Sequence, residues 1–221
     1  MHHHRLLSTA LRRCMDCSFA DPGLGPLSPA LVPVPITAMF IGEGPGQSDS
    51  PVAFLPPGTA AGDAFDQHYL APLGLQRDQV WLTTLLKCRY PPRVYGNKPR
   101  FADQIHTAAD ICAHHWLVHE LDYARPRVVV SLGNQGVYQR LRELFALETP
   151  LDFEDAVGHP HAVNLDGWDL MLFPLVDPDV SRPPGEGDQR RLRSRERWAE
   201  LHHAQHIPVL RAVLEELLVS A

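Results

Sequence analysis

The stretch Ile36-Thr37-Ala38-Met39-Phe40-Ile41-Gly42-Glu43-Gly44-Pro45-Gly46 decides the fold, because an apolar run stops abruptly in glycines. A short apolar run with such a boundary is typical of a buried strand. The glycines let backbone N–H groups approach a ligand, and the carboxylate of Glu43 can orient a water molecule. The run lacks the spacing of a dinucleotide-binding loop and the lysine of a phosphate-binding loop, so by itself it is weak evidence of a site. It predicts a strand followed by a loop that can meet a ligand.

Apolar runs and helical patterns alternate along the rest of the chain. The alternation predicts a mainly parallel sheet of four strands with helices on both faces. Strands are expected at Ile36–Ile41, Val80–Leu86, Arg127–Leu132 and Leu170–Val176, and helices at Arg5–Arg13, Ala60–Leu73, Phe101–Tyr123, Gly133 to about Leu147, and about Arg193 to Val219, with a break at Pro208.

Polar residues follow three of these strands. They are Gly42 to Gln47, Thr84 to Cys88, and Asp177-Pro178-Asp179. The carboxyl ends of parallel strands share one edge of a sheet, where ligands bind in such folds. The sequence therefore predicts a site on this rim.

Length and composition favour one soluble, cytoplasmic domain over residues 1–221, and we expect a monomer. The chain is 44% hydrophobic, which is enough for a real core, and it has no 18-residue apolar span. Its net charge of -6 argues against a generally basic nucleic-acid coat.

Any contact with DNA must therefore be local, and two basic segments are candidates. The first has few acids near it, which favours contact with phosphate, whereas acids are interspersed in the second, which is equally consistent with a solvated surface. The first holds Lys87, Arg89, Arg93, Lys98 and Arg100, and the second Arg182, Arg190, Arg191, Arg193, Arg195 and Arg197.

The four cysteines follow a metal-site pattern, with one tight pair, Cys14 and Cys17, and two distant members, Cys88 and Cys112. A Cys-x-x-Cys turn presents two thiolates to one centre, and two more complete a zinc or iron-sulfur site. Two disulfides are an alternative, although no apolar signal segment precedes Cys14. A thioredoxin-like redox pair would follow a strand, whereas this pair follows a helical start. Spacing alone separates zinc from iron-sulfur poorly.

Several segments together resemble one family, the iron-sulfur uracil-DNA glycosylases of the family-4 branch. The resemblance runs from Cys14 to about Arg182 and rests on the cysteine pattern, Gly42–Gly46, Pro51–Phe54, Leu82–Arg89, Val128–Gly133 and Phe173–Arg182. It implies a three-layer α/β/α fold, a 4Fe-4S cluster on Cys14, Cys17, Cys88 and Cys112, and a pocket for a base flipped out of DNA during base-excision repair.

The resemblance also implies residue roles. Glu43 would activate the attacking water, Phe54 would stack on the base, and the backbone of Gly42 to Gly44 would contact it. Cleavage of a glycosidic bond produces an oxocarbenium-like sugar and an anionic base, so a carboxylate near the sugar and donors near the base both lower the barrier.

Thr84 departs from the family pattern, which has an asparagine that pairs with uracil at this strand end. A hydroxyl lacks the planar donor and acceptor pair of an amide. Losing one bidentate base contact typically costs about 1 to 3 kcal/mol of selectivity. We expect discrimination of uracil to suffer.

Asp177 departs further, because the family has a histidine there that donates a hydrogen bond to the departing base. At about 4 Å and an effective dielectric near 20, an ionised aspartate would repel that anion by about 4 kcal/mol, or about three decades in rate. Asp177 is therefore protonated through burial, faces another leaving group, belongs to a silent pocket, or caps the following turn. A catalytically silent iron-sulfur protein that binds DNA or senses redox state is the alternative function.

The segment Arg89 to Phe101 carries Pro91, Pro92, Gly96 and Pro99. These residues predict an ordered but non-helical excursion. Arg93 and Tyr95 would then be free to meet phosphate and base, with plain surface decoration as the alternative.

Overall fold

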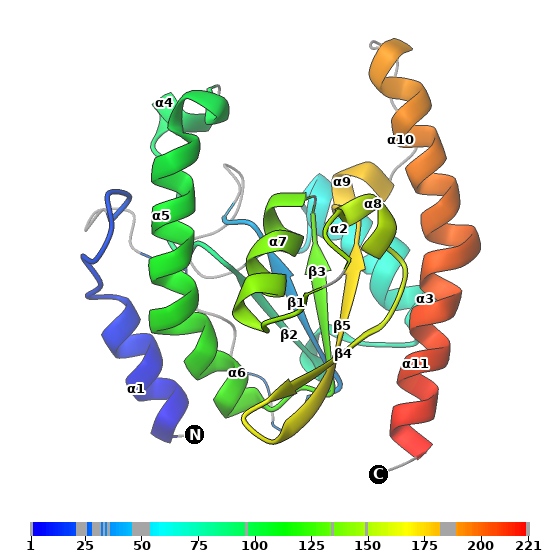
Figure 1. Cartoon of the computed structure of the whole chain (residues 1–221), viewed down its shortest axis with the longest axis horizontal. Helices are drawn as coiled ribbons and strands as arrows, with labels where there is room; N and C mark the ends of the chain where they lie inside the picture. Colours follow the sequence, from blue (N-terminus) through cyan, green and yellow to red (C-terminus); the bar gives the residue numbers. More distant parts are fainter. Residues whose placement is uncertain are drawn as a thin grey trace.

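Among the residues that the structure describes, five strands form one sheet in the spatial order β2, β1, β3, β5, β4 (Figure 1). The computed structural model describes residues 2–20, 26–27, 32, 34, 36–45, 54–95, 97–133, 135–148, 150–181 and 189–219. The first four strands in this order run parallel, and β4 pairs with β5 antiparallel. The strands are β1 (Ala38–Gly42), β2 (Val80–Thr84), β3 (Val128–Leu132), β4 (His161–Leu165) and β5 (Trp168–Leu175).

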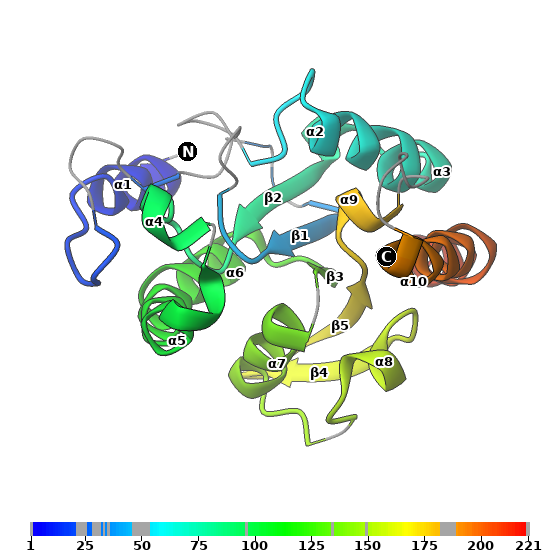
Figure 2. The same cartoon turned by 90° about the horizontal axis from the view of Figure 1, so that it is seen from above.

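Helices cover both faces of the sheet, so the α/β class is confirmed (Figure 2). Met39 and Ile41 of β1 pack on one face with residues of η4, α6 and α7. Ala38 and Phe40 point to the other face and pack with residues of α2, η1 and α11. Because both faces are covered, every position of β1 and β3 is buried, which explains why their sequences are apolar apart from Ser131.

The prediction of four strands is wrong, because β4 adds an antiparallel edge. Burial along β4 is partial, and Val163 is its one buried residue. A tight turn joins β4 to β5, in which Asp166 and Gly167 have φ angles of 50° and 81°. Positive φ at both central residues is the geometry that suits a two-residue hairpin, and it favours Asp-Gly.

The predicted helices are present with small shifts of their ends. Ala60–Leu73 is continuous, as is 98–124. In the described chain, no helix combines the length and apolar character that crossing a membrane requires. The helical elements are α1 (His2–Leu11), α2 (Ala60–Phe65), η1 (Asp66–Leu70), α3 (Ala71–Leu73), η2 (Arg77–Gln79), α4 (Pro92–Tyr95), η3 (Lys98–Phe101), α5 (Ala102–Cys112), η4 (Ala113–Leu117), α6 (Val118–Ala124), α7 (Gln135–Leu144), α8 (Phe153–Ala156), α9 (Pro178–Ser181), α10 (Gln189–Leu201), η5 (His202–His206) and α11 (Ile207–Val219).

The segment Arg89 to Phe101 is not the non-helical excursion that its prolines predict. It contains the helical turns α4 and η3. Pro92 is the first residue of α4, and Pro99 lies in the first turn of η3. Proline is tolerated in a first turn, where its missing N–H has no intrahelical partner to lose.

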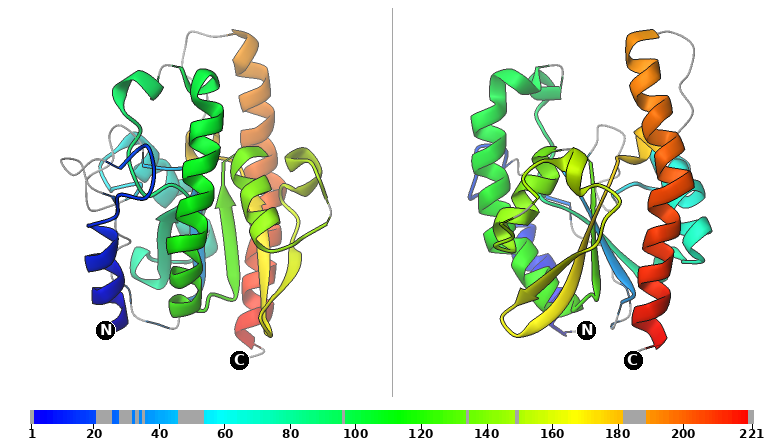
Figure 3. Two further views of the ribbon diagram at one scale, coloured as in Figure 1. Left: turned by 60° about the vertical axis from the view of Figure 1, so that its left-hand side comes forward. Right: turned by 45° about the vertical axis from the view of Figure 1, so that its right-hand side comes forward.

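The C-terminal helix passes Pro208 without a break. The chain is helical from Gln189 to Val219, and the π-helical turn η5 lies just before the proline, so that α10, η5 and α11 form one long column beside the sheet (Figure 3). A proline clashes with the carbonyl four residues before it, and a locally widened turn relieves that clash.

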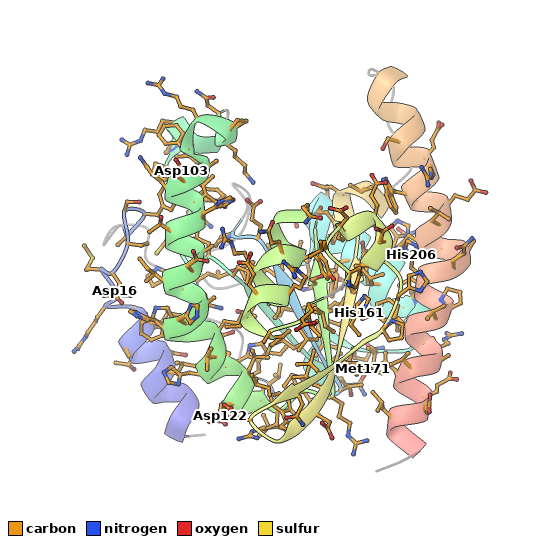
Figure 4. All side chains as sticks on the ribbon, viewed as in Figure 1. Asp16, Asp103, Asp122, His161, Met171 and His206 are labelled. Atoms are coloured by element: carbon orange, nitrogen blue, oxygen red, sulfur yellow. The ribbon has the colours of Figure 1, made fainter. Side chains whose placement is uncertain are left out.

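Two histidines of η5 pack this helical column against the rest of the protein. The ring of His202 is buried, and its Nε2 lies 3.0 Å from the carbonyl oxygen of His68. His206 covers Gly158, where an added Cβ would lie 2.2 Å from His206 Cδ2 (Figure 4). Burial lowers the pKa of His202 to about 3. His202 is therefore a neutral ring in the folded protein near neutral pH.

Candidate active site

The carboxyl ends of β1, β2 and β5 lie at one edge of the sheet, as the sequence predicts. Gly42 at the end of β1 pairs in register with Thr84 at the end of β2. Leu175, the last residue of β5, pairs with Leu132 of β3, and Asp177 lies two residues further along the chain. In Figure 1 this edge is the upper one, where α9 lies.

Gly42 and Phe54, two of the predicted base-binding residues, lie in direct contact. A Cβ added to Gly42 would lie 2.3 Å from Cζ of Phe54. The aromatic ring therefore rests on the backbone of the glycine loop, and this position has no room for a side chain. At Gly44 the nearest atom to an added Cβ would be Leu86 Cβ at 3.4 Å, which is an ordinary contact. Gly46, Gln47 and Pro51 to Ala53 lie outside the described residues.

Backbone hydrogen bonds fix the loop that carries Glu43. The N–H of Leu85 donates to the carbonyl oxygen of Gly42 at 2.8 Å, and the N–H of Leu86 donates to that of Glu43 at 2.9 Å. The pairing of β1 with β2 thus continues past the ends of both strands.

The carboxylate of Glu43 has two side-chain donors. Lys98 Nζ lies 2.6 Å from Oε2, and the hydroxyl of Tyr90 donates to Oε1 at 3.1 Å. Lys98 also lies over the ring of Tyr90, 5.0 Å from its centroid. The Glu43 side chain is 41% exposed, so water can still reach it.

Sequence reasoning missed these two partners of Glu43. It placed Lys98 among phosphate contacts and gave Tyr90 no role. No local pattern connects residues this far apart in the chain. Tyr90 lies in the segment after β2, and Lys98 begins η3, so only the folded chain brings both to Glu43.

Asp177 caps the short helix α9. Its Oδ1 accepts a hydrogen bond of 2.9 Å from the N–H of Asp179, and Pro178 occupies the first helical position. The turn-capping interpretation of Asp177 therefore describes its geometry.

The same carboxyl group faces the rest of the rim. Although Asp177 is exposed as a residue, the protein surrounds its carboxyl group closely, and this desolvation raises its pKa. The N–H of Asp179 lowers the pKa, the charges of Asp179 and Glu43 raise it, and the charge of Lys98 lowers it. Asp177, Glu43 and Lys98 thus form one electrostatic group.

Thr84 lies at the predicted strand end but is completely buried. Its hydroxyl donates to the carbonyl oxygen of Leu86 at 2.8 Å. This bond commits the one hydrogen of Thr84 to the backbone, so its oxygen can act toward a base only as an acceptor.

Three of the four cysteines gather at one point, and all four are free thiols. The thiols of Cys112 and Cys88 hydrogen-bond to the sulfur of Cys17, which lowers the pKa of Cys17 and raises those of Cys88 and Cys112. Cys14 is close enough for its charge to act on Cys88, while its own thiol donates to Asp16 Oδ2 at 3.3 Å.

These thiols provide the donor chemistry of a metal or cluster site without closing one. In the described part of the chain, no group of three or more His, Cys, Asp or Glu side chains is arranged so that it could hold a metal ion as it stands. Thiols are the donors that zinc and iron-sulfur clusters take, and their number matches a four-cysteine site. The donor set fits, and Cys14 would have to turn away from Asp16 to join it.

Lys87 makes no phosphate contact, contrary to the interpretation of the first basic segment. It is completely buried, where its Nζ lies 2.7 Å from Glu120 Oε1 and donates to Thr83 at 2.6 Å. The indole N–H of Trp81 donates to the other oxygen of Glu120.

The other basic residues are divided between surface and interior. Arg93 and Arg100 are exposed, as is Arg197 of the second segment. Nη2 of Arg89 is buried and has no hydrogen-bond partner among the described residues. Arg182, and the side chains of Tyr95, Arg190, Arg191, Arg193 and Arg195, lie outside the described residues.

The sequence of this chain matches the model of a known protein family. The model of the uracil DNA glycosylase superfamily matches residues 29–180, which include the glycine loop, Lys98 and Asp177 but not Cys14 and Cys17. A type-4 uracil-DNA glycosylase from Saccharolobus solfataricus is 24% identical over 188 residues, or 81% of this chain and 78% of the relative.

Two further relatives carry the same description. The type-4 uracil-DNA glycosylase from Sulfurisphaera tokodaii is 27% identical over 143 residues, covering 63% of this chain and 58% of the relative. That from Archaeoglobus fulgidus is 31% identical over 151 residues, covering 64% of this chain and 66% of the relative. The chain thus spans less than two thirds of the length of each of these two relatives.

Proposed function

The chain belongs to the uracil-DNA glycosylase superfamily, and we propose on this premise that it hydrolyses the N-glycosidic bond of a damaged or deaminated base flipped out of DNA. The position of Glu43 carries the proposal. Its half-exposed carboxylate stands at the carboxyl end of β1, next to a glycine on which an aromatic ring rests. Phe54 would hold the base, and Glu43 would face the sugar.

The proposed reaction is the hydrolysis of the bond between the sugar and the base. The oxygen of a water molecule bonds to C1′ of the sugar as the bond from C1′ to the base breaks. The electron pair of that bond leaves with the base. One proton of the water passes to Glu43 and then to solvent, while the departing base takes up a proton. Glu43 orients the water and stabilises the positive sugar in the transition state.

DNA would meet the protein through local basic residues, because the net charge of the whole chain is -6. Arg93 and Arg100 support this part of the proposal, since both are exposed on the turns that also carry Lys98. A monomer in the cytoplasm, as expected from the sequence, suits such a repair protein.

We further propose that Cys14, Cys17, Cys88 and Cys112 hold a 4Fe-4S cluster. The contacts among three of these sulfurs support it. A bound cluster would tie the N-terminal segment and the loop after β2 to α5, coupling their folding to metal binding. Purified protein should contain iron and acid-labile sulfide and absorb visible light, whereas stoichiometric zinc without sulfide would contradict the cluster. Cys112→Ser should lose the absorbance.

Single-turnover base release tests the glycosylase. The substrates are oligonucleotides containing uracil, xanthine or hypoxanthine, and the proteins are the wild type and Glu43→Gln. We expect release of at least one base by the wild type and a rate at least about 10²-fold lower for the variant, the lower bound for losing a positioned general base. Equal rates would show that Glu43 does not activate the water.

A catalytically silent DNA-binding or redox-sensing protein is the second candidate. One observation favours it: both oxygens of Glu43 accept hydrogen bonds, from Lys98 and Tyr90. Both oxygens are thus already engaged by the protein, as they would be in a carboxylate with a purely structural role. No base release from any of the three substrates, together with retained DNA binding, would favour this function over the glycosylase.

A further inference from the structure

One ammonium group acts on both carboxylates of the candidate site. Lys98 Nζ lies 2.6 Å from Glu43 Oε2, and its charge also lowers the pKa of Asp177. Lys98 Nζ also contacts the ring of Tyr90, and the hydroxyl of that ring donates to the other oxygen of Glu43. These side chains come from the loop after β1, the turn η3, the segment after β2 and the segment after β5, so the group exists only in the folded protein.

The proposed reaction needs a positive charge at this place. When the glycosidic bond breaks, its electron pair moves onto the base. The two neighbouring carboxylates repel this negative charge, although Glu43 also stabilises the positive sugar. A histidine donor would assist departure of the base, but this chain has Asp177 at the corresponding position. A cation fixed beside Glu43, whose charge also reaches Asp177, offsets negative charge at the site before the reaction begins, and such preorganised charge lowers the barrier.

We propose that Lys98 is a positioning residue that compensates for the absent histidine, by holding Glu43 in one direction and by offsetting the charge of Glu43 and Asp177 as the base departs. The proposal rests on the glycosylase function proposed above. In this role Lys98 affects the rate of base release once DNA is bound. The sequence instead predicts that Lys98 contacts phosphate.

Three variants separate the two roles of Lys98. Lys98→Met removes the charge and keeps the apolar stem, Lys98→Arg keeps the charge, and Arg100→Met removes an exposed charge from the same turn. In single-turnover assays with saturating protein, we expect Lys98→Met to lower the rate about 10²-fold and Lys98→Arg to restore most of it. Arg100→Met, which removes a proposed DNA contact, should weaken DNA binding and reduce its salt dependence.

The titration of Asp177 gives a readout that needs no activity. The groups whose charges act on this carboxyl are Glu43, Asp179 and Lys98. Without Lys98 its pKa should rise further, so the Asp177 carboxyl signal in nuclear magnetic resonance should titrate at higher pH in Lys98→Met than in the wild type or Arg100→Met. If ionised Asp177 opposes departure of the base, the rate of Lys98→Met should fall with pH at a correspondingly higher pH.

The outcomes distinguish this inference from the proposed function. An unshifted Asp177 titration, or a Lys98→Met protein that loses only DNA affinity as Arg100→Met does, would overturn the role of Lys98. If the wild type releases no base at all, the proposed function fails instead, and the titration alone decides whether Lys98 acts on the two carboxylates.

Discussion

The ring of Phe19 lies edge-on against the ring of Tyr90, with the centroids 5.5 Å apart and the planes at 86°. Phe19 follows Cys17 closely in the chain, as Tyr90 follows Cys88. The hydroxyl of Tyr90 reaches Glu43. Two aromatic rings therefore connect the cysteine segments to the candidate catalytic carboxylate. We expect the position of the Glu43 side chain to depend on the packing of the cysteine segments.

Replacing Phe19 tests this connection. Both rings are almost completely buried, so Phe19→Ala should lower the free energy of unfolding by about 3 to 5 kcal/mol, as large deletions in a core do. Tyr90→Phe is the matched control, because it keeps the ring contact and loses the hydrogen bond to Glu43, worth about 1 kcal/mol. Denaturant unfolding measures both. Equal losses for the two variants would mean that the rings do not support each other.

Gly42→Ala should displace the ring of Phe54, because the new Cβ would lie 2.3 Å from Cζ of that ring. If Phe54 stacks on a base, binding of DNA with an unpaired target base should weaken by about 1 to 3 kcal/mol. Gly44→Ala is the control, since its Cβ makes an ordinary contact at 3.4 Å. Adding Gly42→Ala to Phe54→Ala should cost little more than Phe54→Ala alone, and full additivity would contradict the shared role.

The alternation of apolar runs predicted the parallel part of the sheet and its rim, because strands buried on both faces leave continuous apolar sequence. It did not predict β4, which is an edge strand with only Val163 buried. A local signal was present in Asp166-Gly167, a dipeptide typical of two-residue hairpins. The prolines in residues 89–101 predict a non-helical segment, although Pro92 begins α4 and Pro99 lies in the first turn of η3.

The site was predictable where it follows strand ends and not where it depends on tertiary contacts. Glu43, Gly42 and Asp177 follow parallel strands, so their common edge could be derived. The pairing of Lys98 with Glu43 and of Lys87 with Glu120 could not be derived. Both lysines lie in the same basic segment, yet Lys87 is buried and Lys98 is partly exposed. Only the packing of α4, η3 and α6 decides between them.

Lys87→Met should destabilise the protein strongly, because it leaves the completely buried carboxylate of Glu120 without its cation. Breaking a buried pair from one side costs about 3 to 5 kcal/mol, whereas replacing both partners is often neutral or stabilising. The double variant Lys87→Met with Glu120→Leu should therefore recover most of the loss in denaturant unfolding. A double variant less stable than Lys87→Met alone would contradict the ion pair as the cause.

Buried His202 should make the protein sensitive to acid. Its pKa is lowered to about 3 when folded, mainly by burial, against an ordinary value of 6.5 when unfolded. Above about pH 6.5 both states are neutral at this ring, and stability is unaffected. As pH falls from there toward 3, only the unfolded state takes up the proton, so stability decreases by up to about 1.4 kcal/mol per pH unit.

The variant His202→Gln removes this proton uptake and should flatten the loss of stability between pH 6.5 and 3, even if it lowers stability at neutral pH. His106→Gln is the matched control, because it makes the same replacement at an exposed histidine of α5. Unfolding curves at a series of pH values give the slope directly. A slope as steep in His202→Gln as in the wild type would assign the acid sensitivity to other groups, His206 first among them, since burial lowers its pKa as well.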